Sequence, residues 1–217
     1  MSEPSVRALI FDYDGLIVDS ERIEAEAIIE VLAELGATVT FEDFGHLFGT
    51  VDADHVWEEL VQGWCGRTVA DLDVLVRPRT TARKDALDLL PGVLELLEHA
   101  RERDLRVGLG TGNRMETLER RLGRNGVLHR FEAIVTRAEV ERGKPHPDIY
   151  LEVARRLEVE PHACLVLEDS VPGCEAAIAA GMRVVACPSV VTAHCAYPAE
   201  ARRVTSLLEL LDDEVWR

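Results

Sequence analysis

The first apolar run of the chain ends in two carboxylates that are separated by one residue. Residues 8–11 are continuously apolar, and Asp12, Tyr13, Asp14 and Gly15 follow them directly. A continuous apolar run is typical of a strand covered on both faces of a parallel sheet, and such sheets bind ligands where their strands end. Two carboxylates at that position can act as nucleophile, as acid and base, or as ligands of a divalent cation.

Three further polar segments follow apolar runs later in the chain. They are Thr111-Gly112-Asn113, Gly143-Lys144-Pro145 and Glu168-Asp169-Ser170. Because the strands of one parallel sheet end at the same edge, we expect these segments to converge with Asp12 and Asp14. The combined carboxylates, hydroxyl and lysine suit a site that binds magnesium and a phosphoryl group together, since magnesium prefers oxygen ligands and takes few carboxylates beside substrate phosphate.

The Asp-x-Asp spacing alone carries little information. It recurs at Asp52-Ala-Asp54 and Asp71-Leu-Asp73, where no strand precedes it, and we interpret these acids as helix caps or exposed side chains. Residues 108–112 are rich in glycine but lack the Gly-x-Gly-x-x-Gly spacing of a dinucleotide-binding turn. The convergence of four segments, rather than any one of them, therefore carries the prediction.

The elements that position these segments alternate along the chain. Apolar segments predict five strands, at residues 6–11, 105–110, 132–136, 163–167 and 183–187. Stretches of helical periodicity separate the last four, which predicts an α/β fold with a Rossmann-like parallel sheet of five or more strands and helices on both faces. Helix starts are predicted at Asn113, near Pro172 and at Ser206.

The stretch between the first two predicted strands is too long for one crossover and has helical periodicity of its own. Ser20 is expected to cap a helix that ends at Gly36, and Pro91-Gly92 to open the helix that leads back to the sheet. Trp57 and Trp64 share one helix face and are interpreted as cap packing. We therefore expect an α/β core of residues 1–15 and 90–217, with a helical cap inserted at residues 16–89.

Composition narrows the classes of function. The chain has 217 residues, 47% of them hydrophobic, and a formal net charge of -16, which argues against nucleic acid as a partner. No apolar run is long enough for a membrane helix and no signal core is present, so we expect a cytoplasmic protein. The five cysteines form no Cys-x-x-Cys pair, which argues against a disulfide framework or a zinc site. A monomer is weakly favoured.

With the four segments in this order, the chain resembles the haloacid dehalogenase superfamily of phosphohydrolases, in the branch whose helical cap follows the first strand. The fuller strings FDYDGLIVDSE at residues 11–21, GKPHPDIY at residues 143–150 and LVLEDSVPG at residues 165–173 are similar to the β-phosphoglucomutase and phosphoglycolate phosphatase group. The similarity extends over nearly the whole chain and is weakest in the cap.

The resemblance implies a role for each motif residue. Asp12 would attack phosphorus and become an aspartyl phosphate, and Asp14 would protonate the leaving oxygen and then deprotonate the attacking water. Thr111 would donate its hydroxyl to the phosphoryl group, while the backbone amides of Gly112 and Asn113 would add positive potential.

The remaining motif residues would handle charge. Lys144 would reduce the repulsion between Asp12 and the phosphoryl group. Magnesium would be held by the carboxylates of Asp12 and Asp169 and by the backbone carbonyl of Asp14. Glu168 would be either a further ligand or a partner of Lys144 or of bound water.

A phosphatase that acts on a small phosphorylated metabolite, such as a sugar phosphate, is the first hypothesis. Relative to β-phosphoglucomutases, Glu24 replaces a cap-hinge histidine, and Asp52 replaces an arginine that would hold a second phosphate. A mutase therefore ranks second, a dehalogenase third, and a non-catalytic binding protein has no supporting feature. Glu24 and Asp52, together with His55 and Arg79, are the cap residues expected to face the substrate, and hinges are expected near residues 16–19 and 89–92.

Overall fold

One parallel sheet forms the centre of the molecule in the computed structural model, which describes residues 5–49, 54–212 and 214–216. Its strand order is β3-β2-β1-β4-β5-β6, and every neighbouring pair is parallel. The strands are β1 Ala8–Phe11, β2 Arg106–Thr111, β3 Ala133–Thr136, β4 Cys164–Glu168, β5 Arg183–Ala186 and β6 Arg202–Arg203. All five predicted strands are confirmed.

The sixth strand was not predicted from the sequence. β6 consists of two exposed arginines that pair with Val185 and Ala186 at the edge of the sheet. A two-residue edge strand buries no side chain, so it leaves no apolar pattern to find.

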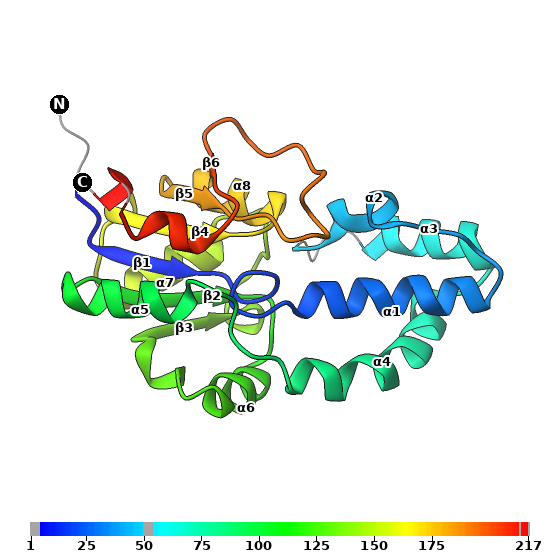
Figure 1. The fold of residues 1–217 in the computed structure, drawn as a ribbon. Helices are drawn as coiled ribbons and strands as arrows, with labels where there is room; N and C mark the ends of the chain where they lie inside the picture. Colours follow the sequence, from blue (N-terminus) through cyan, green and yellow to red (C-terminus); the bar gives the residue numbers. More distant parts are fainter. Residues whose placement is uncertain (1–4, 50–53, 213, 217) are drawn as a thin grey trace.

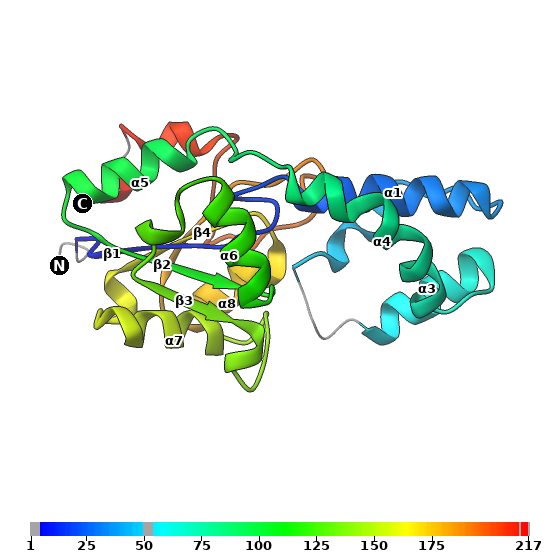
Figure 2. The same ribbon diagram turned by 90° about the horizontal axis from the view of Figure 1, so that it is seen from below.

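Helices cover both faces of the sheet, as predicted (Figure 2). The core helices are α5 Val93–Glu102, α6 Met115–Arg124, α7 Asp148–Leu157 and α8 Val171–Ala179. Alternate residues of β1 point to opposite faces: Leu9 and Phe11 pack in one cluster with side chains of α5 and α6, whereas Ala8 and Ile10 pack in another with side chains of α7 and α8. This burial on both faces explains the continuous apolar run before Asp12.

The cap helices lie beyond the carboxyl ends of the strands (Figure 1). They are α1 Ser20–Glu34, α2 Phe41–Phe44, α3 Asp54–Cys65 and α4 Val69–Asp85. Their apolar faces form a separate cluster that includes Leu32, Phe44 and Val61. Trp57 and Trp64 both pack against Phe44, with ring centroids 5.6 and 6.0 Å away, which confirms that they contribute to cap packing.

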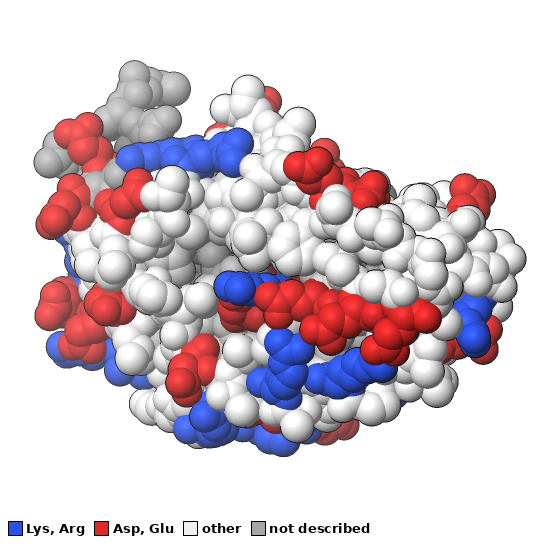
Figure 3. Space-filling model, turned by 45° about the vertical axis from the view of Figure 1, so that its right-hand side comes forward, with Lys and Arg blue, Asp and Glu red and all other residues white. Residues whose placement is uncertain are grey.

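Ion pairs also join the two long cap helices. Glu26 and Glu34 of α1 pair with Arg83 and Arg79 of α4, at 3.0 and 2.8 Å. Figure 3 shows acidic and basic side chains close together on this side of the molecule. Such exposed pairs each contribute little to the free energy of unfolding, so the apolar cluster is the main link between α1 and α4.

Two connecting segments and one core loop link the cap to the core. The Leu90 N–H donates to the Ile17 carbonyl at 2.8 Å, so the entering and leaving segments run side by side. Val191, between β5 and β6, is fully buried in the cap cluster. We propose that the cap begins near residue 16 and ends near residue 89, at this paired connection.

Short 3-10 helices complete the described chain: η1 Gly45–Leu47, η2 Leu128–Arg130, η3 Arg137–Glu139, η4 Pro161–Ala163, η5 Leu207–Leu210 and η6 Glu214–Trp216. The predicted helix start at Ser206 is correct, because Ser206 and Glu209 form a capping box, but the element is the short η5. Among the described residues, no helix has both the length and the apolar character needed to cross a membrane.

Two predicted helix starts were wrong. α6 begins at Met115 rather than at Asn113, because the Asn113 side chain donates to Asp14 instead of capping the helix. Ser20 is the first residue of α1 rather than its cap, and its hydroxyl likewise donates to Asp14. In both cases a polar side chain of a type that often caps helices instead donates a hydrogen bond to the Asp14 carboxylate, which follows β1.

Candidate active site

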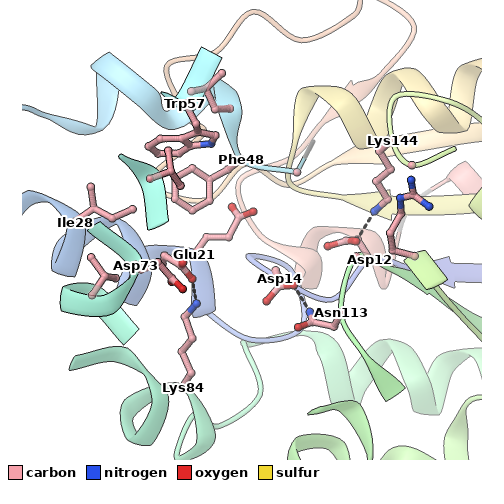
Figure 4. A pocket seen from close by; sticks show the side chains of 18 of the residues that line it. Asp12, Asp14, Glu21, Ile28, Phe48, Trp57, Asp73, Lys84, Asn113 and Lys144 are labelled. Atoms are coloured by element: carbon pink, nitrogen blue, oxygen red, sulfur yellow. Dashed lines mark hydrogen bonds and ion pairs between the residues drawn. The ribbon is translucent and has the colours of Figure 1, made fainter. Parts of the chain in front are cut away.

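The ends of adjacent strands bring the four predicted segments together: Asp12, Asp14, Asn113 and Lys144 line one cavity, and Glu168 and Asp169 lie beside Asp12. Asp12 follows β1, Thr111 ends β2, and Glu168 ends β4, while Lys144 comes from the loop after β3. The cavity has a volume of about 520 Å³ and lies between these strand ends and the cap helices (Figure 4). The prediction that the four segments converge is therefore confirmed.

Lys144 connects two buried carboxylates. Its ammonium contacts the Asp12 carboxylate and lies 2.6 Å from Oε1 of Glu168. Burial opposes the charged form of the lysine, but Asp12 and Glu168 together raise the pKa of Lys144. Burial also raises the pKa of Asp12 to about 8, although the charge of Lys144 acts in the opposite direction. The positive charge of Lys144 therefore favours the ionised form of Asp12, against the effect of burial.

Glu168 is held by several donors at once. Its Oε1 also accepts from the Tyr150 hydroxyl at 2.6 Å, and its Oε2 accepts from the backbone N–H groups of Asp169 and Ser170, both at 3.0 Å. Burial alone would raise the pKa of Glu168, but Lys144 and these donors lower it. Both oxygens are thus already occupied, which favours Glu168 as the residue that orients Lys144.

Asp169 differs from Glu168 in having no such donors. Both of its carboxylate oxygens, and Oε2 of Glu21 beside them, are buried without a hydrogen-bond partner among the described residues. Burial and the surrounding carboxylates raise the pKa of both groups. Buried carboxylates without donors are costly unless a cation pairs with them. Oxygens of Asp12, Glu168 and Asp169 lie within 4.8 Å of one another, so this cluster could hold a metal ion.

Gly15 makes room for these carboxylates. Its φ of +75° lies in the left-handed region that glycine tolerates, and a Cβ there would lie 2.0 Å from Oδ2 of Asp169 and 3.0 Å from Oε2 of Glu21. The chain thus turns toward the cap directly beside the candidate metal site.

Asp14 is positioned from the core and from the cap. Its two oxygens accept from the Ser20 hydroxyl, at the start of α1, and from the side-chain amide of Asn113. Thr111 is fully buried, and its oxygen accepts from the Asn113 N–H at 3.1 Å, which leaves its own O–H able to donate. Gly112 and Asn113 line the cavity beside them, as expected.

The cap residues fit the predictions less well. Glu24 lines the cavity, but it forms an ion pair with Lys84 of α4. Arg79 instead pairs with Glu34, and neither Arg79 nor His55 is among the residues that line the cavity. Asp52 lies outside the described residues.

Glu21 and Lys84 were missed from the sequence. A glutamate in the first turn of a helix is normally attributed to the helix dipole, and a lysine in the last turn likewise. Only the folding of α1 and α4 over the strand ends shows that both side chains line the cavity.

The fold and the site define a class of α/β hydrolase whose helical cap covers the carboxyl ends of the sheet. Residues 9–187 match the model of the haloacid dehalogenase-like hydrolase family. The chain belongs to this family, and the resemblance seen in the sequence is confirmed.

Individual relatives agree with this assignment. The chain is 34% identical to "Putative phosphatase YhcW" of Bacillus subtilis (strain 168), over 94% of each chain. It is also 34% identical to hexitol phosphatase B of Escherichia coli (strain K12), over 87% of each chain. Among solved structures, CbbY from Rhodobacter sphaeroides in complex with phosphate is similar, with a TM-score of 0.72 and 27% identity over 94% of this chain and 96% of CbbY.

Proposed function

We propose that this protein is a magnesium-dependent phosphatase that hydrolyses a small phosphorylated metabolite through an aspartyl phosphate on Asp12. The observation that carries the proposal is the placement of Asp12 and Asp14 in one cavity with Lys144, with the unpartnered carboxylate of Asp169 beside Asp12. The named phosphatases among the relatives support the same reaction class.

In the first step, a carboxylate oxygen of Asp12 forms a bond to phosphorus while the bond between phosphorus and the leaving oxygen breaks. Asp14 gives its proton to that leaving oxygen, so the product departs as an alcohol. In the second step, water attacks phosphorus, Asp14 accepts a proton from this water, and the bond from phosphorus to Asp12 breaks. Inorganic phosphate leaves, and both carboxyl groups return to their starting states.

Three kinds of group offset the electrostatic repulsion between the Asp12 carboxylate and the phosphoryl oxygens. The Lys144 ammonium lies against Asp12, the Thr111 hydroxyl retains its O–H for donation, and Gly112, whose backbone N–H could donate, lines the cavity. These donors are fixed in place before substrate binds, which is the arrangement that stabilises developing charge most effectively.

The donor-free carboxylate of Asp169 fits a bound magnesium ion, since hard cations take oxygen ligands. The carboxylates of Asp12 and Asp169 and the backbone carbonyl of Asp14 would hold the ion, with Glu168 fixing Lys144 beside them. When bound, magnesium supplies positive charge that polarises the phosphoryl oxygens.

The mutase alternative is less well supported. A sugar bisphosphate needs a cation at the end of the cavity far from Asp12. Of the described cap residues that line the cavity, Lys84 alone is a cation, and it is paired with Glu24. Hydrolysis therefore fits the described cavity better than transfer between two hydroxyls of one sugar.

The test is the magnesium-dependent release of p-nitrophenol from p-nitrophenyl phosphate. We expect turnover in the wild-type protein and none in Asp12→Asn. Asp71→Asn is a matched control, because Asp71 has the same Asp-x-Asp spacing but lies in a capping box of α4. Turnover that survives in Asp12→Asn would contradict the assignment of the nucleophile.

A further inference from the structure

The two ends of the cavity have opposite chemical character. Carboxylates, Lys144 and Asn113 line the end at the sheet, where the phosphoryl group would bind. Apolar side chains line the end in the cap; they are Ile28, Leu47, Phe48, Trp57, Val69, Leu72 and Val76. A leaving group that extends from a phosphoryl group at Asp12 into the cap would meet these apolar side chains.

Aromatic rings form one wall of the cap end. Trp57 and Phe48 are both half-buried, and their ring centroids lie 6.3 Å apart at an interplanar angle of 75°. Behind them, the fully buried Phe44 packs against both rings, at 5.6 and 6.0 Å. Figure 4 shows Trp57 and Phe48 together on the side of the cavity opposite Asp14. The aromatic wall is therefore supported from behind and formed before a ligand enters.

Two polar groups at the cap end already have partners, whereas Glu21, whose Oε2 has none, lies beside Asp169 near the sheet. Glu24 pairs with Lys84, and Asp73 pairs with Arg77 at 2.6 Å. A polyol placed there would lose water from several hydroxyls and find few free partners among the described residues. Each buried hydroxyl without a partner weakens binding, whereas a hydrocarbon ring gains from the same surroundings.

We infer that the preferred substrate is the phosphate monoester of an alcohol that carries a hydrophobic ring, with the ring seated against Trp57 and Phe48. This inference rests on the proposed phosphatase function and adds the class of leaving group. Ile28, Leu72 and Val76 form the aliphatic side of the same pocket and are each less than a tenth exposed. The ring thus meets an aromatic wall on one side and aliphatic side chains on the other.

The experiment compares 2-phenylethyl phosphate with sorbitol 6-phosphate and glycerol 3-phosphate. All three are esters of primary alcohols, so the chemical step is closely matched and differences report recognition. We expect kcat/KM for 2-phenylethyl phosphate to exceed both others by at least about tenfold, the range that a hydrophobic pocket provides. An equal or higher kcat/KM for sorbitol 6-phosphate would overturn the inference.

Two tryptophan variants test whether the preference for a hydrophobic ring arises from side chains that line the cavity. Trp57→Ala should lower the ratio of kcat/KM for 2-phenylethyl phosphate to kcat/KM for glycerol 3-phosphate about tenfold. Trp64→Ala is the control, because Trp64 packs on Phe44 but is not among the residues that line the cavity. If Trp57→Ala and Trp64→Ala change the preference equally, cap packing rather than ring contact explains it, and the inference is wrong.

Binding to the inactive Asp12→Asn variant separates this inference from the proposed function. Calorimetry should show tighter binding of 2-phenylethyl phosphate than of glycerol 3-phosphate whether or not the wild-type protein hydrolyses either ester. Hydrolysis without this preference would refute the substrate class alone. The preference without hydrolysis would refute the phosphatase and leave the ring-binding pocket standing.

Discussion

Lys144 is the residue on which the electrostatics of the site depend most. It contacts Asp12 and lies 2.6 Å from Glu168, and all three side chains are buried. Two unit charges about 4 Å apart interact by about 4 kcal/mol at an effective dielectric near 20. In the proposed reaction, the lysine would therefore contribute strongly to holding a phosphoryl group beside the Asp12 carboxylate.

We expect Lys144→Ala to lower kcat by about a hundredfold or more, because each 1.36 kcal/mol of lost stabilisation costs about tenfold in rate. Tyr150→Phe removes one donor from Glu168 but keeps the lysine, so its loss should be about tenfold or less. Steady-state kinetics with a saturating phosphate ester measures both. Similar losses of kcat in the two variants would show that the rate depends on the whole hydrogen-bond network around Glu168 rather than on the Lys144 ammonium.

The carboxylate cluster predicts how pH and magnesium act together on stability. The pKa of Asp12 is raised to about 8, and those of Glu21 and Asp169 are also raised. Between the ordinary carboxyl pKa near 4 and these raised values, the native state binds more protons than the unfolded state. The free energy of unfolding should therefore fall as pH rises through this window when no cation is bound.

A cation that pairs with the ionised carboxylates opposes this loss. We expect the rise in Tm caused by magnesium to be larger near pH 8 than near pH 5, because proton release and metal binding are coupled. Differential scanning fluorimetry measures it, with Asp169→Asn as the variant that should lose the effect. A magnesium shift that is the same at both pH values would contradict a metal site at this cluster.

At the scale of elements, the loop between β5 and β6 connects the candidate metal site to the cap. The Thr192 hydroxyl donates to the backbone carbonyl of Asp169 at 2.7 Å, and the Tyr197 hydroxyl contacts the same carbonyl. Val191, next to Thr192, is fully buried in the cap cluster. Val191, which packs in the cap, is thus adjacent in sequence to Thr192, which contacts Asp169. A displacement of the cap should therefore shift this contact.

Truncation of this valine tests the contact. Val191→Ala should lower the free energy of unfolding by about 1–2 kcal/mol, because it removes buried methyl groups from the cap cluster. Val190→Ala is the control, since Val190 is 53% exposed and should change stability by less than about 0.5 kcal/mol. Denaturant unfolding compares the two. Equal effects would show that Val191 does not anchor the cap.

The elements show what a sequence can and cannot reveal. β1 and the residues at its end were predictable, because burial on both faces leaves a continuous apolar run before Asp12. Asn113 and Ser20 were misassigned as helix caps, since the same side chains that cap helices also bind carboxylates. Glu21 and Lys84 could not be found, because their roles depend on how the cap helices lie over the sheet.

At the scale of the whole molecule, the sheet and the cap contribute different parts of the candidate active site. The sheet provides the four segments proposed to bind the phosphoryl group, and the cap provides most of the cavity that would receive the rest of the substrate. Ser20 and Glu21 extend from the first turn of α1 to the carboxylates of the core, so cap position and catalytic geometry are linked. We propose that the paired segments near Ile17 and Leu90 act as the hinge.

The central claim is that Asp12 carries the phosphoryl group during turnover. The most direct measurement is acid quenching during turnover, followed by borohydride reduction, which converts an aspartyl phosphate to homoserine, and then peptide mapping. We predict homoserine at position 12 in the wild-type protein and in no peptide of Asp12→Asn. Homoserine at another position, or none at position 12 while phosphate is released at the full rate, would contradict the account.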